Sequence, residues 1–225
     1  RAGTAYSALA RGAFGDPATI GKALESNGDV NVWARALRPL VESVVSAVPL
    51  IFVGLGVSVA FRTGIFNIGG AGQFTMGAIG GTIAALFFGA GATPAPVAIL
   101  MVMIFGIIGG AAWAFIPGYL KARLGASEVI TTIMLNFIAS NILFFLVINV
   151  EFIQNPPYIQ PVSKELSQFV ALPGILPIEN LRLNISIIIA LITAVLVSVF
   201  LFRSTRGFEL RAAGLNIAAA KYAGM

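Results

Sequence analysis

The stretch over residues 63–120 decides the fold: TGIFNIGGAGQFTMGAIGGTIAALFFGAGATPAPVAILMVMIFGIIGGAAWAFIPGYL holds 58 consecutive residues without Asp, Glu, Lys or Arg. A helix that crosses a bilayer needs about 20 apolar residues, so this stretch is too long for one span. At its centre, the small residues and two prolines of positions 92–96 predict a tight connection. The stretch therefore predicts two helices of about 23 residues each.

Three further uncharged runs flank this stretch, and each is long enough to span a bilayer. They cover residues 43–61, 129–150 and 183–202. Composition agrees with a membrane protein, because 58% of the 225 residues are hydrophobic, 10% are charged, and the mean hydropathy is +0.93. Soluble domains are about one-quarter charged. We therefore expect an all-α fold, a polytopic membrane helical bundle with five spans.

The distribution of Lys and Arg predicts the orientation of the spans. Over the whole chain, each side of the membrane receives seven Lys and Arg residues. On one side, however, five of the seven lie in the first 40 residues. The remaining loops carry two positive residues on one side and seven on the other. We expect the cytoplasmic side to be the one that holds Arg62, Lys121, Arg123, Arg203, Arg206, Arg211 and Lys221.

Two polar segments lie outside the spans. In the first 40 residues, Asp16 and Pro17 predict the start of a short surface helix, Asn27-Gly28 its end, and Asn31 the start of a second. Residues 151–182 contain five prolines and predict an irregular outer loop.

Several kinds of chemistry are excluded by missing residue types. The chain has no Cys and no His, which excludes thiol nucleophiles, imidazole metal ligands and His-based proton relays. It has no GxxxxGK[ST] phosphate loop, because its one Gly-Lys pair, Gly21-Lys22, is followed by Ala23. We expect no metal, no cofactor and no enzymatic activity in this chain. Any ATP would be bound and hydrolysed by another chain.

The start of the long stretch combines glycines with two amide side chains. Asn67 and Gln73 lie among four glycines at positions 64–72, where a plain span favours Leu and Ala. Glycines permit a broken helix, and a break at membrane depth is tolerated where it is buried in protein or lines a wet cavity. We interpret Asn67 and Gln73 as candidates for a solute pathway, with close helix packing as the alternative. The glycines of positions 77–81 favour helix packing.

A polar stripe runs along the third uncharged segment. Its residues are four apart, so each is rotated by about 40° from the last, and the stripe is expected to face the bundle interior. Glu128, or Ser127 before it, is a candidate helix cap. Thr132 and Asn136 are candidates for solute contact, with interhelical hydrogen bonding as the alternative for Asn136. The stripe comprises Glu128, Thr132, Asn136 and Ser140.

Residues 203–225 predict two short cytoplasmic helices separated by a bend. Gly214 is expected to end the first helix and Asn216 to cap the second, which is rich in alanine. The run of small residues permits a docking surface for a partner as well as a solvated connector.

Three motifs resemble a known family when they are taken together and in order. FRTGIFNIG with Gln73 (residues 61–73), EVITTIMLN (residues 128–136) and the segment 207–224 are similar to the permease subunits of bacterial ABC importers for simple sugars and nucleosides. Within this branched-chain/ribose-like permease family, the second motif resembles the nucleoside-type members.

The resemblance implies a bacterial cytoplasmic (inner) membrane location and a set of partners: ABC ATPase subunits, a second permease subunit, and an extracytoplasmic solute-binding protein or lipoprotein, with no nucleic acid. It places the first two motifs beside the solute pathway and the third against the ATPase. The implied coupling residues are Gly207, Arg211, Gly214, Asn216 and Gly224.

The expected organisation is part of a single transmembrane permease domain, truncated at both ends. Residues 1–40 form an outer amphipathic segment, residues 41–202 the five spans, and residues 203–225 the coupling segment. The leading function is a permease subunit that translocates nucleosides with ATP hydrolysed by a partner. Alternatives are a ribose or simple-sugar ABC permease, an ion-coupled secondary carrier that uses backbone carbonyls, and a structural membrane scaffold.

Overall fold

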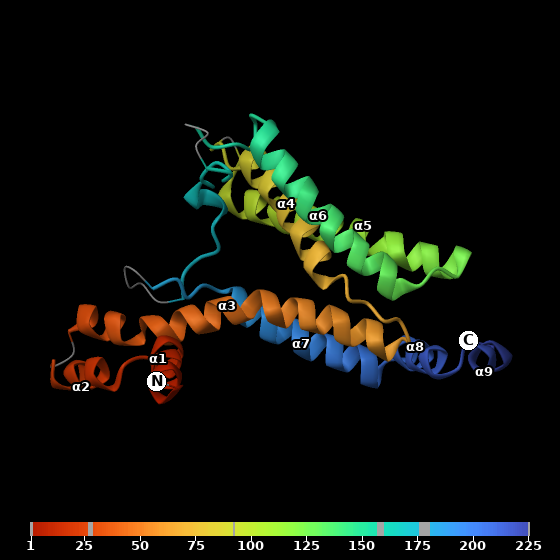
Figure 1. The fold of residues 1–225 in the computed structure, drawn as a ribbon, viewed down its shortest axis with the longest axis horizontal. Coiled ribbons are helices and arrows are strands. Elements are labelled where there is room, and N and C mark those ends of the chain that lie inside the picture. Colours follow the sequence, from red (N-terminus) through yellow and green to blue (C-terminus); the bar gives the residue numbers. More distant parts are fainter. Residues whose placement is uncertain (1, 27–28, 92, 157–159, 176–180, 225) are drawn as a thin grey trace. The chain divides into compact units, whose positions relative to one another are not determined.

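The computed structural model describes residues 2–26, 29–91, 93–156, 160–175 and 181–224, and every regular element among them is helical (Figure 1). Five of the described helices are long and apolar enough to cross a membrane, which confirms the predicted number of spans. These helices are α3 (Val30–Arg62), α4 (Gly70–Phe88), α5 (Ala95–Leu124), α6 (Glu128–Asn149) and α7 (Ser186–Arg203).

The first spanning helix begins earlier than the sequence predicts. The expected surface helix near Asn31 and the run over residues 43–61 form one continuous helix, α3, of 33 residues. A carboxylate oxygen of Asp29 accepts a hydrogen bond from the Asn31 N–H at 2.9 Å, which helps to start the helix. Pro39 and Pro49 lie inside α3. Each proline removes one N–H donor, but its fixed φ suits a helix, and proline is tolerated inside spanning helices.

The polar N-terminal segment contains two short helices, α1 (Ala2–Phe14) and α2 (Pro17–Glu25). The start of α2 confirms the sequence prediction, because Asp16 is its N-cap and accepts a hydrogen bond from the Ala18 N–H at 3.2 Å. Its predicted end at Asn27-Gly28 lies outside the described residues. The sequence does not predict α1, because this segment has no comparable cap signal.

The chain divides into two compact units, 1–52 with 172–196 and 53–171 with 197–225. In the first unit, Ala34 and Val41 of α3 form a buried cluster with Leu181. The turn between α1 and α2 approaches α3 closely, because a β-carbon on Gly15 would lie 3.0 Å from the carbonyl oxygen of Ala36. Gly15 has a φ of +97°, which favours glycine.

In the second unit, α4, α5 and α6 lie side by side (Figure 1). Glycines allow α4 and α5 to approach until their backbones touch. A β-carbon on Gly80 would lie 2.5 Å from the carbonyl oxygen of Phe105, and one on Gly109 would lie 2.6 Å from that of Met76. The structure therefore confirms the packing role predicted for residues 77–81.

Replacing Gly80 with leucine is expected to lower the thermal midpoint of the purified protein. The larger side chain would force α4 away from the Phe105 carbonyl, and overpacking of this kind costs about 1–3 kcal/mol. The matched control is Gly81→Ala, because a β-carbon there would make ordinary contacts of 3.6 and 3.7 Å. An unchanged midpoint for Gly80→Leu would contradict the described contact between α4 and α5.

The described part of the segment between α6 and α7 is irregular, as its prolines predict. It contains one short 3-10 helix, η1 (Gln168–Val170), and isolated antiparallel bridges that join Gln154 to Ser163 and Gly174 to Asn184. Pro157 and Pro177 lie outside the described residues.

The C-terminal segment forms α8 (Thr205–Leu215) and α9 (Ile217–Tyr222), as predicted. The predicted end of α8 at Gly214 is wrong, because the helix continues to Leu215. Asn216 is the C-cap of α8 and also the N-cap of α9, where its side chain accepts a hydrogen bond from the Ala219 N–H at 3.0 Å. The glycine at position 214 is needed for a close contact, described below.

Candidate functional site: a hydrogen-bonded helix break and its link to α8

The break between α3 and α4 lies where the glycine-rich motif predicts it. Residues 65–68 are non-helical, and α4 begins at Gly70 with Gly69 as its N-cap. Gly64 has a φ of +75°, which lets the chain turn sharply at the end of α3. A β-carbon on Gly70 would lie 2.7 Å from a methyl carbon of Val53, so the start of α4 packs closely on α3.

Two amide side chains bridge this break. The Gln73 Nε2 donates to Asn67 Oδ1 at 3.2 Å, and the Asn67 Nδ2 donates to Gln73 Oε1 at 3.4 Å. Asn67 Oδ1 also accepts a hydrogen bond from the Gly69 N–H at 2.8 Å. Asn67 therefore forms a local side-chain turn just before α4, and the pair joins the irregular segment to the first turn of the helix.

The helix α6 holds the other side of the break. Asn136 accepts a hydrogen bond from the Gly72 N–H at 2.8 Å and donates one to the Ile68 carbonyl oxygen at 3.1 Å. Thr132 is 1% exposed, and its hydroxyl accepts a longer hydrogen bond of 3.4 Å from the Ile68 N–H. The same hydroxyl donates to the Glu128 carbonyl oxygen at 2.7 Å.

The four candidate pathway residues thus lie in one hydrogen-bonded cluster, here called the break cluster: Asn67, Gln73, Thr132 and Asn136. Asn136 makes the interhelical hydrogen bonds that were the alternative to solute contact. The approach of α6 needs the glycines of the motif, because a β-carbon on Gly72 would lie 2.8 Å from Asn136 Oδ1 and one on Gly69 would lie 3.1 Å from Thr132 Cβ.

The two ends of the polar stripe behave differently from its centre. Glu128 is the first residue of α6, and its carboxylate pairs with Lys121 in the last turn of α5 at 2.7 Å. Ser127 is the N-cap, but its side chain makes no capping hydrogen bond. Ser140 is exposed and donates to the Asn136 carbonyl oxygen, so the prediction that the whole stripe faces inward is wrong there. The rotation of about 40° per step has carried it off the α4 face.

The bend between α7 and α8 requires Gly207. A β-carbon at this position would overlap the carbonyl oxygen of Phe200. Ser204 is the N-cap of α8, and its hydroxyl accepts from the Gly207 N–H at 2.9 Å and donates to the Phe200 carbonyl oxygen at 2.6 Å. These contacts fix the direction in which α8 leaves α7.

Gly214 brings α8 against the end of α3. A β-carbon on Gly214 would lie 2.6 Å from the Arg62 carbonyl oxygen, and one on Gly64 would lie 2.8 Å from the Gly214 carbonyl oxygen. The backbones of the two segments therefore touch directly. The turn at the start of the break and the last turn of α8 form one contact, here called the glycine contact.

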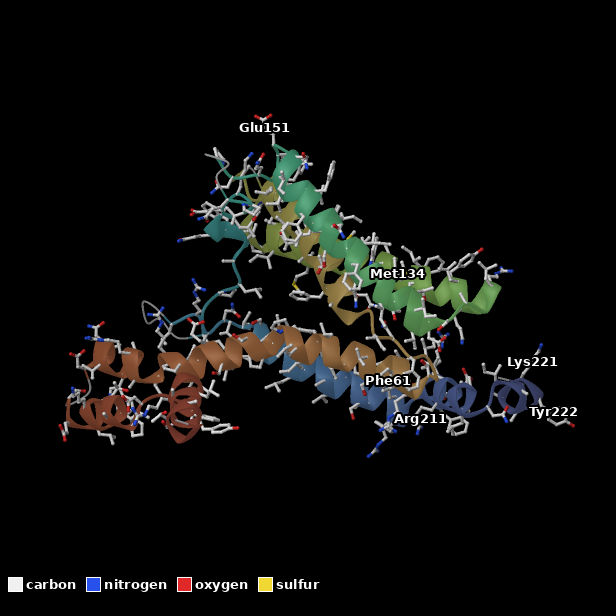
Figure 2. The ribbon with its side chains drawn as sticks, in the orientation of Figure 1. Phe61, Met134, Glu151, Arg211, Lys221 and Tyr222 are labelled. Atoms are coloured by element: carbon white, nitrogen blue, oxygen red, sulfur yellow. The ribbon has the colours of Figure 1, made fainter. Side chains whose placement is uncertain are left out.

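Arginines beside the glycine contact share an aromatic ring. The guanidinium carbon of Arg211 lies 5.1 Å from the centroid of the Phe202 ring, and that of Arg62 lies 5.5 Å from it. Figure 2 labels Arg211 on α8 and Phe61 at the end of α3. Cation–π contacts of this kind contribute about 0.5–1 kcal/mol each at exposed sites. Phe202 therefore joins the ends of α3 and α7 to α8.

Gly224 and the exposed face of α9 end the described chain. Gly224 has a φ of +80° just after α9, and its N–H donates to the Lys221 carbonyl oxygen at 3.2 Å. Around α9, Leu215, Ile217 and Tyr222 are 90%, 77% and 96% exposed. Figure 2 shows Lys221 and Tyr222 projecting from this end of the chain.

Two members of this site have contacts that the sequence does not predict. Gly64 was noted for the break, but its contact with Gly214 joins residues 150 positions apart, and no local signal predicts it. Phe202 ends an uncharged run, which predicts only that it belongs to the span. Its position next to Arg203 and one turn before α8 does not predict that the guanidinium groups of Arg62 and Arg211 lie over its ring.

These features define a protein with several membrane-spanning helices, one break between helices held by amide side chains, and a short helix pair packed against the end of a span. Residues 40–225 match the family described as "Branched-chain amino acid transport system / permease component", and the chain belongs to this family. It is a multi-pass integral protein of the cytoplasmic membrane.

Curated relatives include two nucleoside permeases and a sugar permease. The guanosine ABC transporter permease protein NupP of Bacillus subtilis is 34% identical over 98% of this chain and 56% of its own length. The nucleoside ABC transporter permease protein NupB of Lactococcus lactis is 35% identical over 84% of this chain and 52% of its own length. The glucose ABC transporter permease protein TsgB13 of Haloferax volcanii is 32% identical over 83% of this chain and 50% of its own length.

The chain spans about half the length of these relatives. No solved structure matches it.

Proposed function

We propose that this chain is part of the permease subunit of an ABC importer that moves nucleosides across the cytoplasmic membrane. The observation that carries the proposal is the similarity to two nucleoside permeases over most of the chain. ATP is bound and hydrolysed by partner ATPase subunits, and the solute arrives from an external binding protein or lipoprotein. A second permease subunit completes the pathway, and this chain holds no cofactor.

The break cluster is proposed to border the pathway. Each Asn or Gln amide has two N–H donors and an oxygen with two lone pairs. Asn136 uses one donor and one lone pair on the main chain, so part of its capacity remains for a solute. Asn67 and Gln73 bond mainly to each other, and a polar solute could replace those two side-chain bonds. Nucleosides carry matching amide, amine and hydroxyl groups.

The glycine contact is proposed to couple the ATPase to the pathway. An ATPase that moves α8 and α9 would move Gly214, and with it Gly64 at the start of the break. The exposed apolar residues around α9 supply a surface on which an ATPase can dock. Gly207, Arg211, Asn216 and Gly224 set the direction, anchorage and ends of these helices.

The proposal is tested by substrate competition. The full-length permease, coexpressed with its ATPase and binding protein, is expected to take up tritiated guanosine, and an excess of adenosine or uridine is expected to reduce that uptake at least tenfold. Equal excesses of ribose and glucose are expected to leave it unchanged. Uptake of labelled glucose without uptake of any nucleoside would assign the chain to the sugar-transporting members, like the Haloferax volcanii relative.

A further inference from the structure

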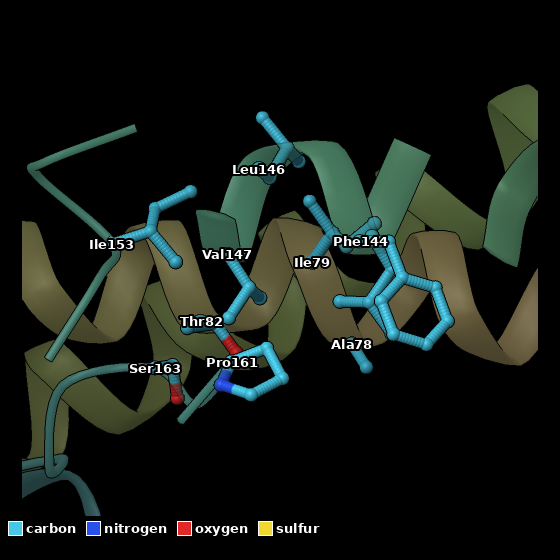
Figure 3. A pocket seen from close by; sticks show the side chains of 10 residues that line it. Ala78, Ile79, Thr82, Phe144, Leu146, Val147, Ile153, Pro161 and Ser163 are labelled. Carbon is cyan, nitrogen blue, oxygen red and sulfur yellow. The ribbon is translucent and has the colours of Figure 1, made fainter. Parts of the chain in front are cut away.

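A pocket lies farther along the two helices that carry the break cluster. Its volume is about 330 Å³, and α4, α6 and the segment after α6 line it (Figure 3). Ile79 and Val147 form part of its apolar wall, and Pro161 and Ser163 contribute from the outer segment. Small-molecule sites typically have volumes of about 300–1,000 Å³, so this pocket suits a ligand of one or two rings.

The pocket and the break cluster lie along one seam between α4 and α6. Ile79 follows Gly72 by seven residues on α4, and Leu143 follows Asn136 by seven on α6. Seven residues are two helical turns, or about 10.5 Å. Ala139, which is 0% exposed, lies between Asn136 and Leu143 on α6. The two sites are therefore neighbours separated by a closed stretch of the seam.

Thr82 is unusual among the threonines of the described spanning helices. The other four donate their hydroxyls to main-chain carbonyl oxygens four residues earlier, at 2.7–3.0 Å: Thr75, Thr131, Thr132 and Thr193. The Thr82 hydroxyl makes no hydrogen bond with any described residue, and Thr82 lines the pocket. The Ser163 hydroxyl is likewise without a bond to a described residue. Both residues are partly exposed, so each hydroxyl can offer a hydrogen bond to a polar ligand in the pocket.

We propose that this pocket is an outer binding site for a single nucleoside, which occupies it before it reaches the break cluster. The proposal rests on the proposed nucleoside function. The hydroxyls of Thr82 and Ser163 would bond to polar groups of the base or ribose, and Phe144 in the pocket lining offers an aromatic face on which a base can stack. A lipid acyl chain would need neither hydroxyl, and valine at position 82 would suit it better.

The test is photolabelling of the full-length permease in lipid nanodiscs with 8-azidoadenosine, followed by peptide mapping. Labelling is expected on α6 near Phe144 or on the segment around Ser163. Thr82→Val and Ser163→Ala are each expected to lower it about fivefold, as the loss of one hydrogen bond implies. Thr75→Val is the matched control, because it lies on the same face of α4 and its hydroxyl bonds only to its own helix. It is expected to leave labelling unchanged.

Other outcomes separate the pocket from the proposed function. Nucleoside uptake with labelling confined to peptides that contain the break cluster, or labelling equal in Thr82→Val and the parent, would overturn the pocket and leave the function intact. Labelling of the pocket by a photoreactive phospholipid that excess adenosine fails to displace would assign it to lipid and overturn the proposal. Absence of both nucleoside labelling and nucleoside uptake would overturn the function itself.

Discussion

Replacing Gly214 with alanine is expected to reduce nucleoside uptake at least tenfold. The added β-carbon would lie 2.6 Å from the Arg62 carbonyl oxygen and 2.8 Å from the Thr63 carbonyl carbon. Such distances are shorter than van der Waals contact, so α8 must move away from the end of α3. Because the contact involves backbone on both sides, no flexible side chain can relieve it.

Gly214→Ala is expected to lower stability, which is opposite to the usual effect of this substitution in a helix, so the loss would be specific to the glycine contact. In a helix, glycine to alanine normally stabilises by about 0.5–1 kcal/mol. Gly118→Ala in α5 is the matched control, because nothing lies within 4 Å of a β-carbon there. We expect Gly118→Ala to be neutral or stabilising, and Gly214→Ala to lower the thermal midpoint.

Three measurements on the assembled transporter check the role of Gly214. They are uptake of tritiated guanosine, ATP hydrolysis, and recovery of the ATPase with the permease during purification. We expect ATP hydrolysis to continue or the ATPase to be lost, while uptake falls in either case. Normal uptake by Gly214→Ala would show that the glycine contact is dispensable for coupling.

Replacing Asn136 with leucine is expected to have the second large effect. Leucine has a similar volume but leaves the Gly72 N–H and the Ile68 carbonyl oxygen without their side-chain partner. Each unpaired group costs about 1–3 kcal/mol when it is shielded from water. We expect a lower thermal midpoint and at least a tenfold loss of uptake, because the break is no longer held against α6.

The matched control for Asn136 lies on the same helix. The Asn141 side chain is exposed and donates only to the Phe137 carbonyl oxygen of its own helix, at 2.8 Å. Asn141→Leu is therefore expected to keep most of the stability and uptake. If Asn136→Leu lost uptake with an unchanged thermal midpoint, the role of Asn136 would be solute contact alone. That result would refute the claim that its hydrogen bonds hold the break against α6.

The number and type of the long helices were predictable because charge placement is a strong signal in membranes. A charged residue is costly in hydrocarbon, so the 58-residue uncharged stretch and its central prolines specify two spans. The start of α2 was predictable for a local reason, since Asp16 before Pro17 caps a helix. The start of a helix near Asn31 was also predictable, but its continuation into the first span was not, because Pro39 and Pro49 resemble breaks, yet α3 continues through both.

The break cluster was predictable in its residues but not in its bonds. Amide and hydroxyl side chains at membrane depth need hydrogen-bond partners, which predicts a polar cluster. The four candidate residues do lie together. The sequence could not tell that Asn136 bonds to the main chain of Ile68 and Gly72, because that depends on how α6 packs against α4. The glycine contact between Gly64 and Gly214 likewise depends on long-range packing. A glycine at each position indicates only that there is little room for a side chain there.

We propose that this chain works with an ATPase to import nucleosides. This proposal is tested most directly in proteoliposomes that contain the full-length permease, its ATPase and its binding protein, with tritiated guanosine outside and ATP on the ATPase side. We predict accumulation that requires hydrolysable ATP and persists when ionophores collapse the proton and sodium gradients. Accumulation that proceeds without ATP or without the ATPase, and stops with the ionophores, would contradict the claim and identify an ion-coupled carrier.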